Sequence, residues 1–297
     1  MMFGGKGGVG KTTCAAATAL HYSRTGRRTI AITTDATPSL SHIFETDGKH
    51  RVTRVADNLF FRELGQDVVR EMWDDRFGHE VHQVFSSFVS IGYDEFAGFM
   101  TSVLPGLADE FMVDHTRELA AQGEYDAIVW DTAPMGQTLA LLRTPGLLAE
   151  HLRMAPRIYS KLRVAERTRE PVLSIIRRWA RMSSANMEFL RTKVSVTLVT
   201  IAEALAVSQL DGILRELCAE GIPAQEIIVN NLVRDESSEF LRTRAAGQKR
   251  YLDLIHQKCS TLRIRELPLS PLEVKGVDRL RAIADILFPD SGGPPGI

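Results

Sequence analysis

A glycine-rich segment near the amino end has the residue types and spacing of a phosphate-binding loop, or P-loop. It fits the pattern G-x-x-x-x-G-K-[ST] and consists of Gly5, Lys6, Gly7, Gly8, Val9, Gly10, Lys11 and Thr12, followed by Thr13. Glycines let successive backbone N–H groups turn onto phosphate oxygens, and the amino end of the next helix adds partial positive charge. We therefore expect Lys11 to contact the β- and γ-phosphates of a nucleotide, Thr12 to bind Mg²⁺ and Thr13 to lie near the α-phosphate.

A second candidate is an aspartate at the end of an apolar run. Asp131 directly follows the run Tyr125-Asp126-Ala127-Ile128-Val129-Trp130. Such a strand-end carboxylate can organise the water shell of Mg²⁺ beside a P-loop. Asp35 also follows an apolar run, residues 29–34, and on spacing alone it could either cap the chain or act on water.

The sequence predicts that the elements positioning these residues form an α/β fold with a parallel sheet. A short strand over 1–3, the P-loop, a helix over 11–24 and a strand over 29–34 form one βαβ unit. Further short apolar runs predict strands, at residues 125–131, 194–201, 227–232 and 262–267. Runs of this kind suit a mainly parallel sheet covered by helices on both faces. Because only three residues precede the glycines, we expect either a clipped first strand or a native start further upstream.

Two helical segments interrupt this alternation. Apolar residues recur at helical spacing over about 59–123 and 139–192, so we expect two helical insertions into a single domain covering 1–297. The second is basic, with eleven Lys or Arg and three acidic residues over 151–193. The net charge of −1 is therefore the sum of +8 in residues 151–193 and −9 in the rest of the chain. Residues 289–297, rich in Pro and Gly, predict a flexible tail.

Composition excludes several classes of protein. The chain has 36 Lys and Arg against 37 Asp and Glu, which argues against a nucleic-acid partner held by a global basic field. Three cysteines make no disulfide framework, so we expect a cytoplasmic protein. We also expect all three cysteines to be small buried residues. No apolar run approaches the length of a membrane span, so we expect any membrane role to be peripheral, through a partner.

Lys6 and the segment after Asp131 carry a family resemblance. The string G-K-G-G-V-G-K-T-T resembles the deviant Walker A loop of the MinD, ParA, nitrogenase-iron-protein and ArsA group, whose first lysine reaches nucleotide bound by the partner subunit. This implies a P-loop NTPase fold and a homodimer across the nucleotide, with Lys6 acting in trans. The string starting at Asp131 resembles the switch II signature of ArsA-family ATPases. The residues that match this signature, and that we expect to form switch II, are Asp131, Thr132, Ala133, Pro134 and Gly136.

The same resemblance extends to three other segments. Residues 34–44 are similar to the family's switch I, which implies that Asp35 positions or activates the attacking water. The segment departs from the family pattern at Pro38, Ser39 and His42. Asn230 and Pro268 resemble the family's adenine-binding residues, and an amide can pair with both N6 and N7 of adenine.

ArsA-family members include arsenite-pump ATPases and the guided-entry ATPases that carry tail-anchored membrane proteins. The cysteines here are not at the insertion positions where the pumps carry theirs. Residues 235–253 have no Cys for the carriers' zinc clamp, so zinc is not expected. Apolar residues of the insertions could form a groove for hydrophobic helices or simply the insertions' own core, and they include Phe85, Phe88, Phe96, Phe99, Met100, Phe111, Met112, Met154, Met182 and Met187. The resemblance implies a Mg-ATP-hydrolysing carrier with a moving helical subdomain, or alternatively the ATPase of an arsenite, antimonite or other anion pump.

Overall fold

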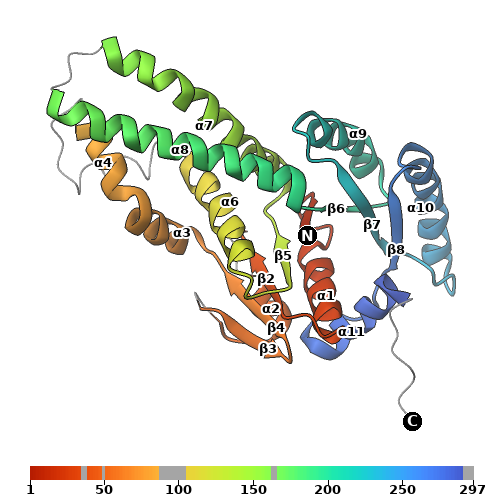
Figure 1. The fold of residues 1–297 in the computed structure, drawn as a ribbon. Helices are drawn as coiled ribbons and strands as arrows, with labels where there is room; N and C mark the ends of the chain where they lie inside the picture. Colours follow the sequence, from red (N-terminus) through yellow and green to blue (C-terminus); the bar gives the residue numbers. More distant parts are fainter. Residues whose placement is uncertain (35–38, 49–50, 87–104, 162–165, 290–297) are drawn as a thin grey trace. The chain divides into compact units, whose positions relative to one another are not determined.

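Short strands rich in branched and aromatic residues build one eight-stranded sheet. The computed structural model (Figure 1) describes residues 1–34, 39–48, 51–86, 105–161 and 166–289. The strands are β1 (Met2–Gly5), β2 (Thr29–Thr33), β3 (Thr53–Ala56), β4 (Leu59–Glu63), β5 (Ala127–Asp131), β6 (Val196–Ile201), β7 (Ala224–Leu232) and β8 (Arg263–Pro268). Their order is β3-β4-β2-β5-β1-β6-β7-β8, and every adjacent pair except β3–β4 is parallel. The predicted α/β class with a mainly parallel sheet is confirmed.

Contacts divide the chain into two compact units. The sheet unit comprises Met1–Gly65, Gln122–Thr138 and Val194–Ile297, and the helical unit comprises Gln66–Ala121 and Leu139–Lys193. The prediction of helical structure from residue 59 was wrong at its start, because β4 occupies Leu59–Glu63 and buries alternate residues. That alternation has the period of a strand, and three adjacent apolar residues were too short a run to show it.

Helices cover both faces of the sheet. In the sheet unit they are α1 (Lys11–Arg24), α2 (Leu40–Phe44), α9 (Ala204–Ala219), α10 (Glu239–Lys258) and α11 (Gly276–Leu287). Helix α1 packs closely through four buried alanines into a core that also contains residues of α2 and α11. The crossover from β1 to β2 runs toward one sheet edge and that from β6 to β7 toward the other. Right-handed crossovers in opposite directions place α1 and α9 on opposite faces, and the adjacent β1 and β6 define the switch point where α/β sheets bind ligands.

The described part of the helical unit is built from short and long helices. They are α3 (Gln66–Trp73), the π-helix η1 (Asp74–Gly78), α4 (His79–Ser86), α6 (Pro105–Gln122), α7 (Met135–Lys161) and α8 (Glu166–Lys193). Phe111, Met112 and Met187 are buried here, so these three belong to the unit's own core. The other apolar residues proposed for a groove lie largely outside the described residues or side chains. Residues 290–297 of the predicted flexible tail also lie outside them.

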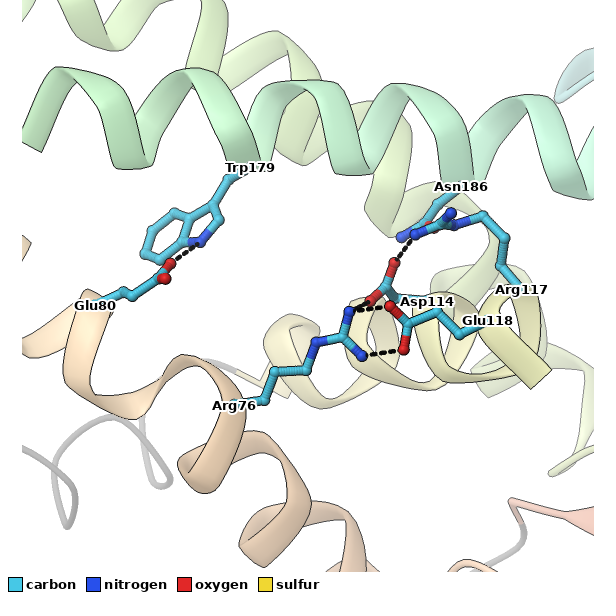
Figure 2. Close-up of polar contacts among 7 residues, drawn as sticks. All are labelled: Arg76, Glu80, Asp114, Arg117, Glu118, Trp179 and Asn186. Carbon is cyan, nitrogen blue, oxygen red and sulfur yellow. Dashed lines mark hydrogen bonds and ion pairs between the residues drawn. The ribbon is translucent and has the colours of Figure 1, made fainter. Parts of the chain in front are cut away.

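A buried charged cluster ties three elements of the helical unit together (Figure 2). Asp114 of α6 is 0% exposed, and each of its two carboxylate oxygens contacts a different arginine. Arg76 of η1 lies 2.7 Å from Oδ2 and also pairs with Glu118, while Arg117 contacts Oδ1. The Nε of Arg117 donates a 2.7 Å hydrogen bond to Asn186 of α8. The cluster therefore fixes the packing of η1, α6 and α8 on one another.

A second polar contact joins α4 to α8. The indole Nε1 of Trp179 donates to Glu80 at 3.1 Å, and Arg178 forms an ion pair with the same glutamate (Figure 2 shows the Trp179 contact). The Glu80 side chain is partly buried. This contact adds a defined register between the two helices.

Candidate nucleotide-binding site

The P-loop connects β1 to α1, and positive φ angles together with close neighbouring atoms favour glycine at two of its positions. Gly5 has φ +153°, and a Cβ there would lie 2.2 Å from the Val199 carbonyl oxygen. Gly10 has φ +93°, and a Cβ there would lie 2.2 Å from Nδ2 of Asn230. A side chain at either position would combine backbone strain with a steric clash. Gly7 and Gly8 between them are exposed.

The loop lysine that closes the motif is buried at the start of α1. Lys11 is 7% exposed, and its Nζ donates to the carbonyl oxygen of Lys6 at 3.0 Å. Lys6 is partly exposed at the other end of the loop. A positive charge is thus held inside a loop whose backbone N–H groups also favour anions.

Thr12 and Asp131 meet beside the loop. The Thr12 hydroxyl donates to Oδ2 of Asp131 at 2.7 Å, and Asp131 is 1% exposed. Asp131 reaches this place because β5 pairs with β1 in a register that sets Phe3 opposite it. A hydroxyl and a carboxylate oxygen in contact are the hard ligands that suit Mg²⁺. The donor set therefore fits the predicted metal.

The segment after Asp131 is anchored to β1. The Thr132 hydroxyl donates to the carbonyl oxygen of Phe3 at 2.7 Å. The Thr138 hydroxyl lies 2.7 Å from the Ala133 carbonyl oxygen and 2.9 Å from Oγ1 of Thr132. Pro134 is exposed, and its Cγ lies 3.9 Å from where a Cβ on Gly7 would be. The predicted switch II segment therefore lies against the P-loop.

Asn230 of β7 contacts the P-loop directly. It is 7% exposed at the end of β7, and its Nδ2 donates to the Val9 carbonyl oxygen at 2.9 Å. An amide has a second N–H and a carbonyl oxygen, so this bond leaves groups that can pair with an adenine edge. Pro268 ends β8 opposite Leu232 of β7.

Asp35 and Pro38, predicted within switch I, lie outside the described residues. The preceding residue, Thr34, donates its backbone N–H to the carbonyl oxygen of Asp131 at 3.2 Å. After the gap, the N–H of Ser41 in α2 donates to Oε1 of Glu63 at 2.8 Å, and Glu63 is 5% exposed. Sequence reasoning missed Glu63, because the run Leu59-Phe60-Phe61 does not show the alternation that would have marked a strand ending at this residue.

The environments of the cysteines differ. Burial, together with the negative charge of Asp131, raises the pKa of the Cys14 thiol to about 12. Burial also raises the pKa of Cys259, which is 1% exposed. Cys218, however, is exposed on α9, so the prediction of three buried cysteines was wrong for this residue. It occupies the outer side of the last helical turn, which residue type alone does not indicate.

Comparison with known proteins decides the family. Residues 1–289 match the family model of the ArsA ATPases, described as anion-transporting ATPases. The chain belongs to the ArsA ATPase family. As an ArsA-family ATPase it is an enzyme that acts on ATP. Among the helices that the structure describes, none is long and apolar enough to cross a membrane.

Relatives of this ArsA-family ATPase have names of two kinds. An Aquifex aeolicus protein named as an arsenical pump-driving ATPase is 27% identical over 96% of this chain and 97% of its own length. ATPase GET3B of Arabidopsis thaliana is 28% identical over 97% of this chain and 78% of its own length. ATPase asna-1 of Caenorhabditis elegans is 28% identical over 92% of this chain and 88% of its own length.

Proposed function

We propose that the chain is a Mg-ATP-dependent homodimeric ATPase whose nucleotide state moves its helical unit. The observation that carries this proposal is the 2.7 Å contact between Thr12 and Asp131 beside the buried Lys11. Thr12 and Asp131 would hold Mg²⁺, with Asp131 acting through water, and the bound ion would neutralise charge on the phosphates. Lys11 stabilises the charge that develops as the γ-phosphate is transferred to water.

Two residues complete the proposed reaction. Asp35 accepts or directs the proton of the attacking water. Lys6 contacts the nucleotide of the second protomer, so the active arrangement is a dimer. Asn230 and Pro268 bind the adenine.

The proposed biological role is that of a cytoplasmic carrier for hydrophobic helices of membrane proteins. Support comes from the position of the three cysteines, all of which lie in the sheet unit rather than in the helical unit. A metalloid-activated pump would need thiolates that converge on one ion. The alternative, an ATPase that drives an anion pump in the membrane, is favoured by relatives named for arsenical pumps.

Substitutions at the site test the chemistry. Lys11→Ala should abolish nucleotide binding, measured with a fluorescent ATP analogue, because it removes the buried charge of the loop. Asp35→Asn should keep binding and lower turnover by about 10²–10⁴-fold, the range for loss of acid–base assistance. Undiminished turnover in the Asp35 variant would remove that carboxylate from the mechanism.

Two further measurements test the dimer and the role. Light scattering with Mg²⁺, ADP and aluminium fluoride should show the mass of a dimer for the wild type and a lower mass for Lys6→Ala. A wild-type monomer under all conditions would contradict the role of Lys6. ATPase stimulation by a detergent-solubilised transmembrane peptide supports the carrier, whereas stimulation by antimonite alone supports the pump.

A further inference from the structure

One side of helix α8 is an exposed row of polar and basic residues that the nucleotide site does not use. We call this row the arginine strip. Its residues recur every three or four positions and are exposed, so they share one side of the helix, and they are Ser174, Arg177, Arg181, Ser184, Glu188 and Arg191. The opposite side is buried, as at Ile176, Met187 and Leu190. The strip therefore faces outward along most of the described length of α8.

The strip has three arginines against one glutamate, and the surrounding part of α8 is also basic. Over residues 173–193 the helix has five basic residues and one acidic residue, Glu188. Arg178, beside the strip, pairs with Glu80 and so contributes less. The basic residues of the strip itself are all arginine, whose planar guanidinium binds phosphate and carboxylate through two parallel hydrogen bonds.

The composition of the strip distinguishes between possible partners. Protein interfaces usually have apolar or aromatic anchors at their centre, whereas all six positions of the strip are polar or charged. A surface of anionic lipid headgroups needs no such anchor, since it presents phosphates and carboxylates to any facing cation. From Ser174 to Arg191 a helix rises about 26 Å, enough to face several headgroups.

We propose that the arginine strip of α8 binds the surface of an anionic membrane. The contact is electrostatic and peripheral, with the buried side of α8 remaining in the core of the helical unit. This goes beyond the proposed function and does not depend on it, because no residue of the strip belongs to the nucleotide site. A protein that failed as a carrier could still bind such a membrane through α8.

Sedimentation with lipid vesicles tests the proposal on the full chain. Vesicles of equal parts phosphatidylserine and phosphatidylcholine should bind the wild type, and phosphatidylcholine vesicles should not. Replacing Arg177, Arg181 and Arg191 by Ser should weaken binding by about fivefold for each arginine, roughly a hundredfold in total. Glu188→Ser should strengthen it, because it removes the negative charge from the strip.

A matched control separates the strip from the total charge. The triple variant Arg215→Ser, Arg242→Ser, Arg250→Ser removes the same charge from exposed positions on α9 and α10 and should bind like the wild type. Circular dichroism and ATPase activity without vesicles monitor folding, and single Arg177→Ser replaces the triple variant if that variant is unfolded.

Three results would overturn the proposal. The first is an equal loss of vesicle binding in the strip variant and the control variant. The second is equal binding of the wild type to both vesicle types, and the third is absence of vesicle binding by the wild type. If the wild type instead bound a polyglutamate peptide through the strip and bound neither vesicle, the surface would belong to an acidic protein partner.

Discussion

Asp114→Asn should destabilise the protein far more than the same change at an exposed ion pair. The substitution keeps the shape of the side chain but removes its charge. In the wild type each carboxylate oxygen faces a different arginine, Arg76 or Arg117. Asparagine has only one acceptor oxygen, so one arginine would face an NH₂ group, which is also a donor. The variant thus loses the ion pair with one arginine and weakens the contact with the other.

The size of the effect follows from burial. Removing one partner of a fully buried ion pair costs about 3–5 kcal/mol, and hydrogen bonds to charged groups contribute about 1.5–3 kcal/mol each. Asp114 is 0% exposed, but the arginine side chains are 32% and 28% exposed, so water can partly solvate them in the variant. Arg76 also keeps Glu118, and Arg117 keeps Asn186. We therefore expect a loss of about 2–3 kcal/mol, or about 3–5 °C in Tm for a chain of this length.

The assay is urea and thermal unfolding followed by circular dichroism, with Asp211→Asn as the matched control. Asp211 pairs with Lys258, but their side chains are 44% and 38% exposed. An exposed pair of this kind contributes about 0–1 kcal/mol. Equal shifts in the two variants would refute the argument that the buried cluster stabilises the helical unit, as would a shift below about 1 kcal/mol for Asp114→Asn.

Three other predictions concern single residues. Ellman's reagent should react with one thiol of the folded protein, Cys218, because the other two cysteines are buried; rapid reaction of all three would contradict their burial. Arg76 holds the pKa of Glu118 below its ordinary value, so the stability from this pair is present above pH about 4.3 and is lost as the pH falls through the lowered pKa. Glu118→Gln should accordingly lower the urea midpoint at neutral pH, and an equal loss persisting in acid would argue against the ion pair. Gly10→Ala should weaken binding of a fluorescent nucleotide, since φ +93° is strained for alanine and its Cβ would displace the Asn230 side chain; unchanged affinity would show that the loop does not need glycine here.

Much of the sheet could be predicted because short apolar runs and one motif marked it. The helix after the P-loop begins and ends where the sequence predicted, at Lys11 and Arg24. By contrast, β3 (Thr53–Ala56) has a single large apolar residue in four and pairs only at the sheet edge. β7 begins three residues earlier than predicted, since pairing with β6 extends a strand through polar Gln225 and Glu226.

The site was predictable where chemistry depends on local spacing. The P-loop is a continuous motif, and Asp131 follows a recognisable strand. The contact of Asn230 with Val9 joins residues 221 positions apart, so it depends on the order of strands in the sheet. The Asp114 cluster depends on which helix sides face each other, and helical periodicity identifies a buried side without naming its partner.

The central position of β1 has a consequence for synthesis of the protein. This strand precedes both of its neighbours in the chain, β5, which ends at Asp131, and β6, which ends at Ile201. At about 5–20 residues per second, ribosomes need roughly 10–40 s to progress from β1 to the end of β6. Until β5 has been made, two apolar residues of β1, Met2 and Phe3, have no strand to pair with, although both are fully buried in the finished sheet. The nascent chain therefore exposes an unpaired apolar strand edge for many seconds, and its yield in cells should depend on chaperones that bind such segments.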